Sequence, residues 1–138
     1  MPPVVTCLLL SEGKLLILKR STKVKTYKGY WGGVAGYIEK QEKPYETALK
    51  EIREEVGLQE KDVQLITQGE PVKITDIYEG ERYDWVIHPF IFQVKRKESI
   101  RIDWEHSEYQ WITPKEISQY QTVPFLKEIV QKHLEEPK

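Results

Sequence analysis

The order of strand-like and helical segments constrains the fold of this chain more than any other feature of its sequence. The strand-like runs are residues 4–11, 14–20, 62–78, 83–94 and 107–113. Glu12-Gly13, between the first two runs, is typical of a tight hairpin turn. Helical periodicity is found at residues 44–56 and 123–136. Strands, helix, strands and helix in this order favour an α/β protein of the α+β type, with a mixed β-sheet covered by helices, over an all-β or all-α fold.

Shorter segments connect these elements. We expect a loop at 21–33, a strand end and loop at 34–39, a turn at 79–82 and a helical turn at 114–118. Pro89 lies inside the run 83–94 and has no backbone N–H to donate. It therefore predicts an edge strand or a bulge at that point.

Length and charge limit the class of protein. The chain has 138 residues, close to the size of one domain, and no linker-like or repetitive stretch divides it. We therefore expect a single domain over residues 1–138. The 21 basic and 22 acidic residues give a formal net charge of -1, so no overall positive field favours nucleic acid or an anionic membrane surface. A phosphate-bearing ligand would have to be bound by local features.

The single cysteine, Cys7, indicates a reduced compartment. One cysteine can form neither an intrachain disulfide nor a Cys-rich zinc site. Cys7 lies in the apolar run VVTCLLL, where a free cysteine is usually a small core residue. This run is too short to span a bilayer and lacks the charged start and cleavage site of a signal peptide. We therefore expect a cytoplasmic protein.

The segment 44–56 is the best-defined predicted helix. Pro44 suits its first turn, and Gly57 suits the position just after its end. Successive residues rotate by about 100°, which places five apolar side chains on one stripe facing the core. These are Tyr45, Ala48, Leu49, Ile52 and Val56. Glu51 and Glu55 flank this stripe, so part of the helix's acidic surface should lie where helix and sheet meet.

Three glutamates, Glu51, Glu54 and Glu55, lie within an arc of roughly 100° on this helix. An exposed acidic face, with ion pairs from Lys50 to Glu46 and Glu54, is the structural alternative, because such pairs are common and weak. Against it, Glu51 and Glu55 form a like-charge pair four residues apart, near the helix C-terminus, where the dipole disfavours negative charge. A hard divalent cation such as Mg²⁺ or Mn²⁺ removes both objections.

Gly36 adds a second element to this hypothesis. It lies at a strand end, just before the loop that leads into the helix. A glycine lets the backbone approach a ligand closely. Its carbonyl oxygen could therefore become a further metal ligand.

The segment 36–58, GYIEKQEKPYETALKEIREEVGL, resembles the signature of the Nudix hydrolases. That signature is Gly, five residues, Glu, seven residues, Arg-Glu, an aliphatic, any residue, Glu-Glu, any residue, Gly and an aliphatic. The positions in register are Gly36, Glu42, Glu51, Ile52, Glu54, Glu55, Gly57 and Leu58. Lys50 stands where the family has Arg. The stretches YWGGVAGYIE and EHSEYQWIT also look like Nudix sequence, so the resemblance covers essentially the whole chain.

The resemblance implies a Nudix-like α/β/α sandwich and a pyrophosphohydrolase that cleaves a nucleoside diphosphate linked to another group X. It implies Mg²⁺ or Mn²⁺ as cofactor, with the metal ligands Gly36 (through its carbonyl), Glu51, Glu54 and Glu55. Glu51 and Glu54 would also be catalytic, while Glu42 and Gly57 would support the site. Lys50 would orient a signature carboxylate or contact substrate, although it lacks the bidentate fork of Arg.

Other residues are candidates by chemistry. A base must take the proton of the attacking water, and Glu105 is the first candidate outside the signature, with Glu108 second. The structural alternative is that both are ordinary loop charges. Arg20, beside the basic loop, could bind phosphates distant from the metals. An aromatic such as Tyr27 or Trp85 could stack on a base, although most such rings pack in or around a core.

Several functional alternatives stay open at this point. One is a non-catalytic nucleotide-binding or regulatory Nudix module, although such modules usually lose signature glutamates. Another is an enzyme like isopentenyl diphosphate isomerase. Such enzymes use a catalytic cysteine in a different sequence context from that of Cys7. A structural protein with a chance acidic helix is the third. The resemblance implies a small nucleotide-type diphosphate as substrate, with a nucleoside triphosphate, a dinucleoside polyphosphate and an NDP-sugar as the options, and a homodimer is possible.

Overall fold

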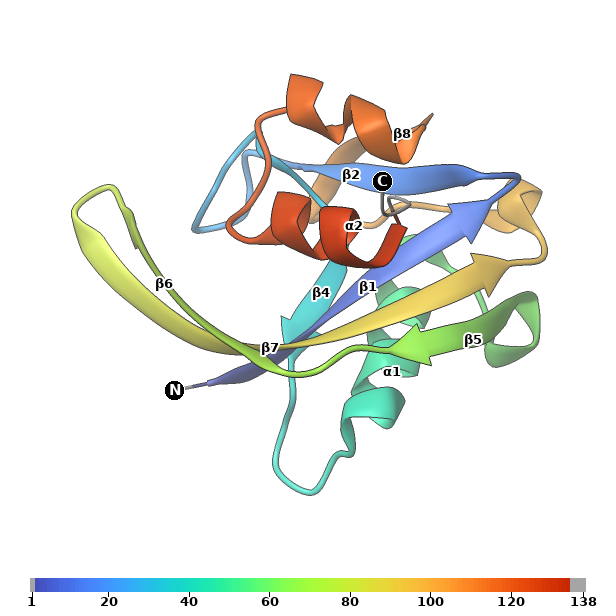
Figure 1. Ribbon diagram of the computed structural model, residues 1–138, viewed down its shortest axis with the longest axis horizontal. Coiled ribbons are helices and arrows are strands. Elements are labelled where there is room, and N and C mark those ends of the chain that lie inside the picture. The colour runs from blue at the N-terminus through green and yellow to red at the C-terminus, as the bar shows by residue number, and fades with distance from the viewer. Residues whose placement is uncertain (1, 135–138) are drawn as a thin grey trace.

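The computed structural model describes residues 2–134, which form eight strands, two α-helices and three short 3₁₀ helices (Figure 1). The strands are β1 (Pro3–Ser11), β2 (Lys14–Arg20), β3 (Trp31–Gly32), β4 (Val34–Tyr37), β5 (Val63–Gln68), β6 (Val72–Tyr78), β7 (Glu81–Val94) and β8 (His106–Ile112). The helices are α1 (Pro44–Val56), α2 (Leu126–Leu134), η1 (Glu60–Asp62), η2 (Lys97–Ser99) and η3 (Pro114–Gln119).

The strands form one mixed sheet built around β1 and β7. These two strands run parallel from the pair Pro3–Val86 to the pair Leu10–Gln93, and every other pairing between strands is antiparallel. The main path through the sheet is β3-β2-β1-β7-β5, while β4 pairs with β1, β6 with β7 and β8 with β2. The β6–β7 hairpin extends beyond the rest of the sheet (Figure 1).

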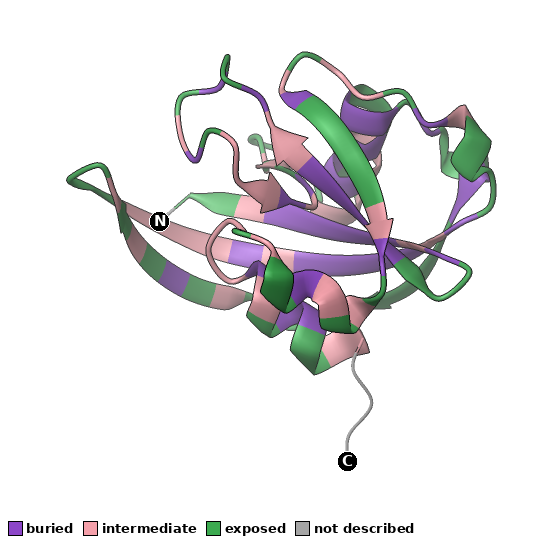
Figure 2. Ribbon diagram, turned by 90° about the horizontal axis from the view of Figure 1, so that it is seen from above, coloured by how far each residue is buried: buried purple, intermediate pink, exposed green. Residues whose placement is uncertain are grey.

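Both faces of the central strands are buried, which explains their nearly continuous apolar sequence. Alternate side chains of β1 enter two separate cores, because successive side chains point to opposite faces of a strand. Cys7 and Leu9 pack with α1, whereas Leu8 packs with α2. Figure 2 shows the two helices on opposite sides of the purple, buried strands. The predicted mixed sheet between helices, an α/β/α sandwich of the α+β class, is confirmed.

The predicted helix at 44–56 is confirmed at both ends. Pro44 opens it, and Gly57 closes it with φ of 74° while its N–H donates to the carbonyl of Arg53 (3.1 Å). The side chains of Ala48, Ile52 and Val56 are buried as predicted; Tyr45 and Leu49 are partly buried. The buried stripe also includes Thr47 and Glu55, so it extends further around the helix than the apolar pattern indicated.

The prediction of one strand over 62–78 is wrong, because β5 and β6 are separate strands on the same side of β7. Pro89 explains the break. It lies in the middle of the sheet, not at an edge, and its carbonyl accepts a hydrogen bond (2.9 Å) from the N–H of Gly69, in the gap between β5 and β6. Pro89 has no N–H for a ladder hydrogen bond, and it lies where neither β5 nor β6 is paired with β7.

The predicted loop at 21–33 contains the two-residue strand β3, and the helical turn at 114–118 is η3. The C-terminal helix begins three residues later than predicted, because Phe125 has a left-handed backbone (φ 72°) that a right-handed helix cannot include. The predicted extension to Glu135 and Glu136 lies outside the described residues. None of the helices within residues 2–134 has the length and apolar character needed to cross a membrane.

Candidate active site

A cavity of about 380 Å³ brings residues from distant parts of the chain together. Gly36, Glu51 and Glu105 give it an acidic side, and Arg20 contributes a guanidinium. Ile74 and Trp85 of the β6–β7 hairpin line its apolar wall. A concave site with an apolar wall and a few charged groups is the usual form of a small-molecule site.

Gly36 lies directly against the acidic face of α1. A β-carbon at this position would be 2.3 Å from Cδ of Glu51 and 2.7 Å from its Oε1. The backbone of β4 and the Glu51 carboxylate therefore approach each other in a space that any side chain would fill. This contact explains why the strand needs a glycine here.

Glu55 is buried beside them, with 2% of its surface exposed. Its Oε1 accepts a long hydrogen bond (3.4 Å) from the N–H of Ala35, and its Oε2 has no hydrogen-bond partner among the described residues. Burial, together with the nearby Glu51 carboxylate, raises the pKa of Glu55 well above its usual range. Burial also raises the pKa of Glu51.

These observations fit a bound cation. An orphaned buried carboxylate oxygen is costly unless a positive charge or a proton accompanies it. Gly36, Glu51 and Glu55 therefore form a set of oxygen donors suited to a hard divalent ion. Glu54 is exposed on the same helix, and within residues 2–134 no group of three or more His, Cys, Asp or Glu side chains converges as a metal site. The metal-binding roles of all four residues stay predictions.

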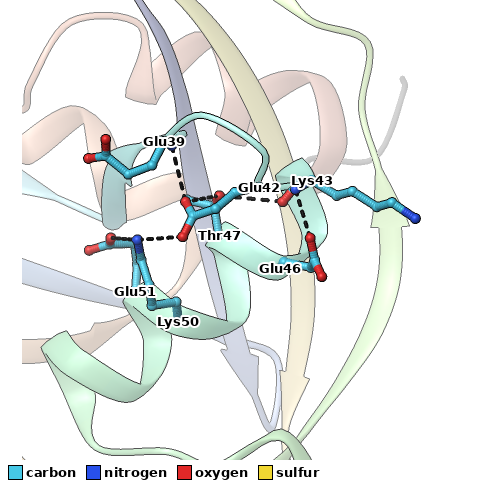
Figure 3. Close-up of polar contacts among 7 residues, drawn as sticks. All are labelled: Glu39, Glu42, Lys43, Glu46, Thr47, Lys50 and Glu51. Atoms are coloured by element: carbon cyan, nitrogen blue, oxygen red, sulfur yellow. Dashed lines mark hydrogen bonds and ion pairs between the residues drawn. The ribbon is translucent and has the colours of Figure 1, made fainter.

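Lys50 pairs with Glu42 and not, as the helical spacing suggested, with Glu46 or Glu54. Its Nζ donates to Oε2 of Glu42 (2.8 Å) and lies 4.0 Å from Oε2 of Glu51 (Figure 3). A hydrogen bond from Lys50, then bonds from the Glu39 N–H and the Thr47 hydroxyl, lower the pKa of Glu42 to about 2.

This network attaches the loop before α1 to the helix that carries the acidic residues. The amine of Lys50 orients Glu42, while the lining of the cavity does not include Lys50. The geometry thus supports the orienting role over substrate contact. Lys50 makes one hydrogen bond to Glu42 and lacks the planar fork of donors that an arginine has.

Glu105 and Arg20 are held side by side by the end of β2. The N–H of Ser21 donates to the carbonyl of Glu105 (2.7 Å), and the Ser21 hydroxyl donates to the carbonyl of Trp104 (2.9 Å). Burial, together with the neighbouring Asp103, raises the pKa of Glu105. Glu108, the second candidate for a base, is exposed on β8 and does not line the cavity. The geometry favours Glu105.

Sequence reasoning assigned no role to Asp103 and His106, which the structure places beside Glu55. Nδ1 of His106 lies 3.0 Å from Asp103 Oδ1, and its Nε2 lies 3.8 Å from Glu55 Oε1. The Asp103 N–H also donates to the backbone carbonyl of Glu55 (3.2 Å). The i,i+3 spacing of Asp103 and His106 was the available signal, but it has meaning only once residues 101–106 lie beside the end of α1.

Cys7 is 1% exposed and packs in the core beside α1, which confirms the prediction of a small core residue. Burial raises the pKa of its thiol well above the usual range. A buried, protonated thiol cannot act as the catalytic cysteine of an isomerase.

Comparison with known proteins agrees with this geometry. The family model described as NUDIX domain matches residues 1–133. The nucleoside triphosphatase NudI of Salmonella typhimurium is 28% identical over 120 residues, which cover 85% of each chain.

Solved structures share the fold. The Escherichia coli dihydroneopterin triphosphate pyrophosphohydrolase has a TM-score of 0.80 at 16% identity, and it covers 96% of this chain and 94% of its own. A Caenorhabditis elegans Ap4A hydrolase in a binary complex has a TM-score of 0.77 at 11% identity with the same coverage. At these identities the two structures establish the fold alone.

Proposed function

Because the chain belongs to the Nudix family, we propose that this pyrophosphohydrolase is a divalent-metal-dependent enzyme that cleaves a nucleoside triphosphate at a diphosphate linkage. The observation that carries the proposal is the shared cavity of Gly36, Glu51, Glu105 and Arg20. It combines donors for a cation, a candidate base and a fixed positive charge within reach of one polyphosphate chain.

Gly36, Glu51, Glu54 and Glu55 would hold Mg²⁺ or Mn²⁺, since carboxylate and carbonyl oxygens suit both ions. When bound, such ions neutralise phosphate oxygens, stabilise the leaving group and lower the pKa of a coordinated water. The chain's own contribution is to fix these donors. Because Gly36 has no side chain, the Glu51 carboxylate can lie against the backbone of β4. Lys50 keeps Glu42 and the preceding loop in place.

Glu105 is the residue that would take a proton from the attacking water. A general base works best when its pKa lies near the working pH, because it must be ionised yet basic. Burial raises the pKa of Glu105 towards that range. Its position on the cavity wall gives it access to the substrate, as the role requires.

Arg20 would bind phosphate oxygens away from the metal donors. Within residues 2–134 its guanidinium forms no ion pair, and it is partly buried at the cavity. A desolvated guanidinium binds phosphate strongly, since its charge is poorly screened and its donors match the geometry of two phosphate oxygens.

The substrate class follows from two observations. NudI, a nucleoside triphosphatase, aligns over 85% of both chains. A cavity of about 380 Å³ also suits one nucleotide, near the lower end of the usual range for ligand sites. The apolar wall with Trp85 offers a surface for a planar base.

The test is a panel of the common nucleoside triphosphates, a dinucleoside tetraphosphate and ADP-ribose, with Mg²⁺ or Mn²⁺ and with chelator. Products are identified by mass. We expect metal-dependent cleavage of at least one triphosphate to a monophosphate and pyrophosphate. Glu54→Gln should abolish it, and Glu128→Gln, at an exposed glutamate of α2, should not. Cleavage only of ADP-ribose or the dinucleotide would replace the substrate class, and no cleavage of any compound would reject the function.

Two further expectations accompany this proposal. The enzyme would act in the cytoplasm, where nucleotides are abundant and the thiol of Cys7 stays reduced. The sequence leaves a homodimer possible, and the molar mass from light scattering would decide between monomer and dimer.

A further inference from the structure

Two backbone hydrogen bonds connect the start and the end of the loop between β2 and β3. The Arg20 N–H donates to the carbonyl of Tyr30, and the Gly29 N–H donates to the carbonyl of Arg20 (both 2.9 Å). The candidate phosphate-binding residue is therefore the last residue of β2, directly before the loop. A movement of this loop therefore shifts the backbone from which the Arg20 side chain extends.

The loop also holds the guanidinium directly. Nε of Arg20 donates to the carbonyl of Thr26 (3.0 Å), and one terminal nitrogen lies 3.4 Å from the Thr26 hydroxyl. This contact fixes the side of the guanidinium that carries Nε, which leaves its other donors for a ligand in the cavity. Burial lowers the pKa of Arg20, so the charge lies in a poorly hydrated position.

Tyr27, the next residue, joins this loop to the long β6–β7 hairpin. Its hydroxyl donates to Oδ2 of Asp76 on β6 (2.5 Å), and its ring lies 4.3 Å from the ring of Tyr78. Only 5% of Tyr27 is exposed, and its φ of 53° is left-handed. A bulky residue keeps this strained conformation only where surrounding contacts impose it. For Tyr27, these contacts are the hydrogen bond of its hydroxyl to Asp76 and the packing of its ring against Tyr78.

These contacts form a continuous path from the hairpin to the cavity. Asp76 holds the Tyr27 hydroxyl, Tyr27 sets the backbone of the adjacent Thr26, and the Thr26 carbonyl holds Arg20. Simple packing would need the ring of Tyr27 but not its hydroxyl. Tyr27 also lines the cavity, so the stacking of its ring on a base stays a prediction beside the role of its hydroxyl.

We propose that Tyr27 is a positioning residue, which through its hydrogen bond to Asp76 fixes the Thr26 carbonyl and thereby aims Arg20 at the phosphates of the substrate. The inference rests on the proposed function for the identity of the substrate. The anion-binding part of it stands independently, because a fixed guanidinium in a cavity binds polyphosphate whether or not the polyphosphate is cleaved.

Two measurements test this. The first is the Kd of inorganic tripolyphosphate with Mg²⁺, by calorimetry. The second is kcat and KM for the nucleoside triphosphate that the wild type cleaves fastest. The variants are Tyr27→Phe, Asp76→Ala and Asp76→Asn. Tyr30→Phe is the matched control, because its ring lies 5.4 Å from that of Tyr27 and its hydroxyl makes no hydrogen bond among the described residues.

Tyr27→Phe and Asp76→Ala should each raise the Kd and the KM about tenfold, the effect of losing one strong hydrogen bond, with kcat changed less than about threefold. Asp76→Asn, which keeps an acceptor oxygen, should recover most of the loss. The double variant Tyr27→Phe/Asp76→Ala should be no worse than either single one, since both remove the same bond. Tyr30→Phe should match the wild type.

The decisive arm uses Arg20→Gln as background. If Tyr27 acts through Arg20, adding Tyr27→Phe to Arg20→Gln changes kcat/KM by less than about twofold. An undiminished tenfold loss in that background would show a merely structural role and overturn the proposal, as would wild-type Kd and KM in Tyr27→Phe. If the wild type cleaves no triphosphate, the proposed function fails. The calorimetry alone then decides the inference, with equal Kd values for wild type and Tyr27→Phe as the refuting result.

Discussion

Gly36→Ala should separate the fold of this protein from its candidate metal site. The added β-carbon would lie 2.3 Å from Cδ, 2.6 Å from Cγ and 2.7 Å from Oε1 of Glu51. Non-bonded carbon atoms rest about 3.5–4.0 Å apart, so the carboxyl end of Glu51 must move by more than about 1 Å. A displacement of this size in a positioned group lowers the rate about a hundredfold, which corresponds to about 2.7 kcal/mol of transition-state stabilisation.

The fold should tolerate the same change. The three atoms nearest the new methyl group belong to the Glu51 side chain, which can rotate away. Gly36 also lies in strand β4 without a left-handed backbone, so alanine suits the position. Without metal, the free energy of unfolding should therefore fall by no more than about 1 kcal/mol, the cost of an unfavourable rotamer.

The assay combines kcat/KM at several Mg²⁺ concentrations with denaturant unfolding in the presence of chelator. A double-mutant cycle with Glu51→Ala is the control, since the methyl group has nothing to displace once Glu51 is truncated. Wild-type kcat/KM in Gly36→Ala would refute the reasoning. So would a loss of several kcal/mol of stability without metal, because the glycine would then serve packing.

Three further predictions concern single carboxylates and their partners. Without metal, Glu55→Gln should be more stable than wild type by about 1–3 kcal/mol at pH 8. Burial raises the pKa of Glu55, so its charge opposes folding increasingly as the pH rises from the usual pKa of 4.5 to the raised one; the gain should disappear towards pH 4, as denaturation across this range would show. Glu105→Gln should lower kcat about 10²–10⁴-fold and remove the acid limb of the pH–kcat profile, and an unchanged limb would assign the base elsewhere. Lys50→Met should raise the pKa of Glu42 from about 2 towards its usual 4.5, so that the fall in stability between pH 4.5 and 2 becomes smaller. Carboxyl NMR titration measures the pKa, with the exposed Lys40→Met as control.

Local signals made much of the fold predictable. Pro44 and Gly57 act on the backbone of their own neighbours, so the limits of α1 follow from the sequence without any tertiary contact. The run around Cys7 is apolar on both faces, which already indicates a central strand. The break between β5 and β6 was missed, because Pro89 acts there across the sheet on a strand about 20 residues away in sequence.

The candidate site likewise has features that follow from local sequence and others that follow from tertiary packing. Which carboxylates are gathered on α1 follows from the sequence, since helical spacing alone places Glu51, Glu54 and Glu55 close together. Their different surroundings depend on the packing of distant segments. Burial leaves one oxygen of Glu55 without a partner, while Glu54 stays exposed.

The contacts of Arg20 depend wholly on the tertiary structure. Its guanidinium is fixed through Tyr27 by Asp76, which lies 49 residues further along the chain than Tyr27. Helix and turn signals report the conformation of neighbouring residues. Burial, and the pKa shifts and hydrogen bonds that follow from it, depends on which distant segments the sheet brings side by side.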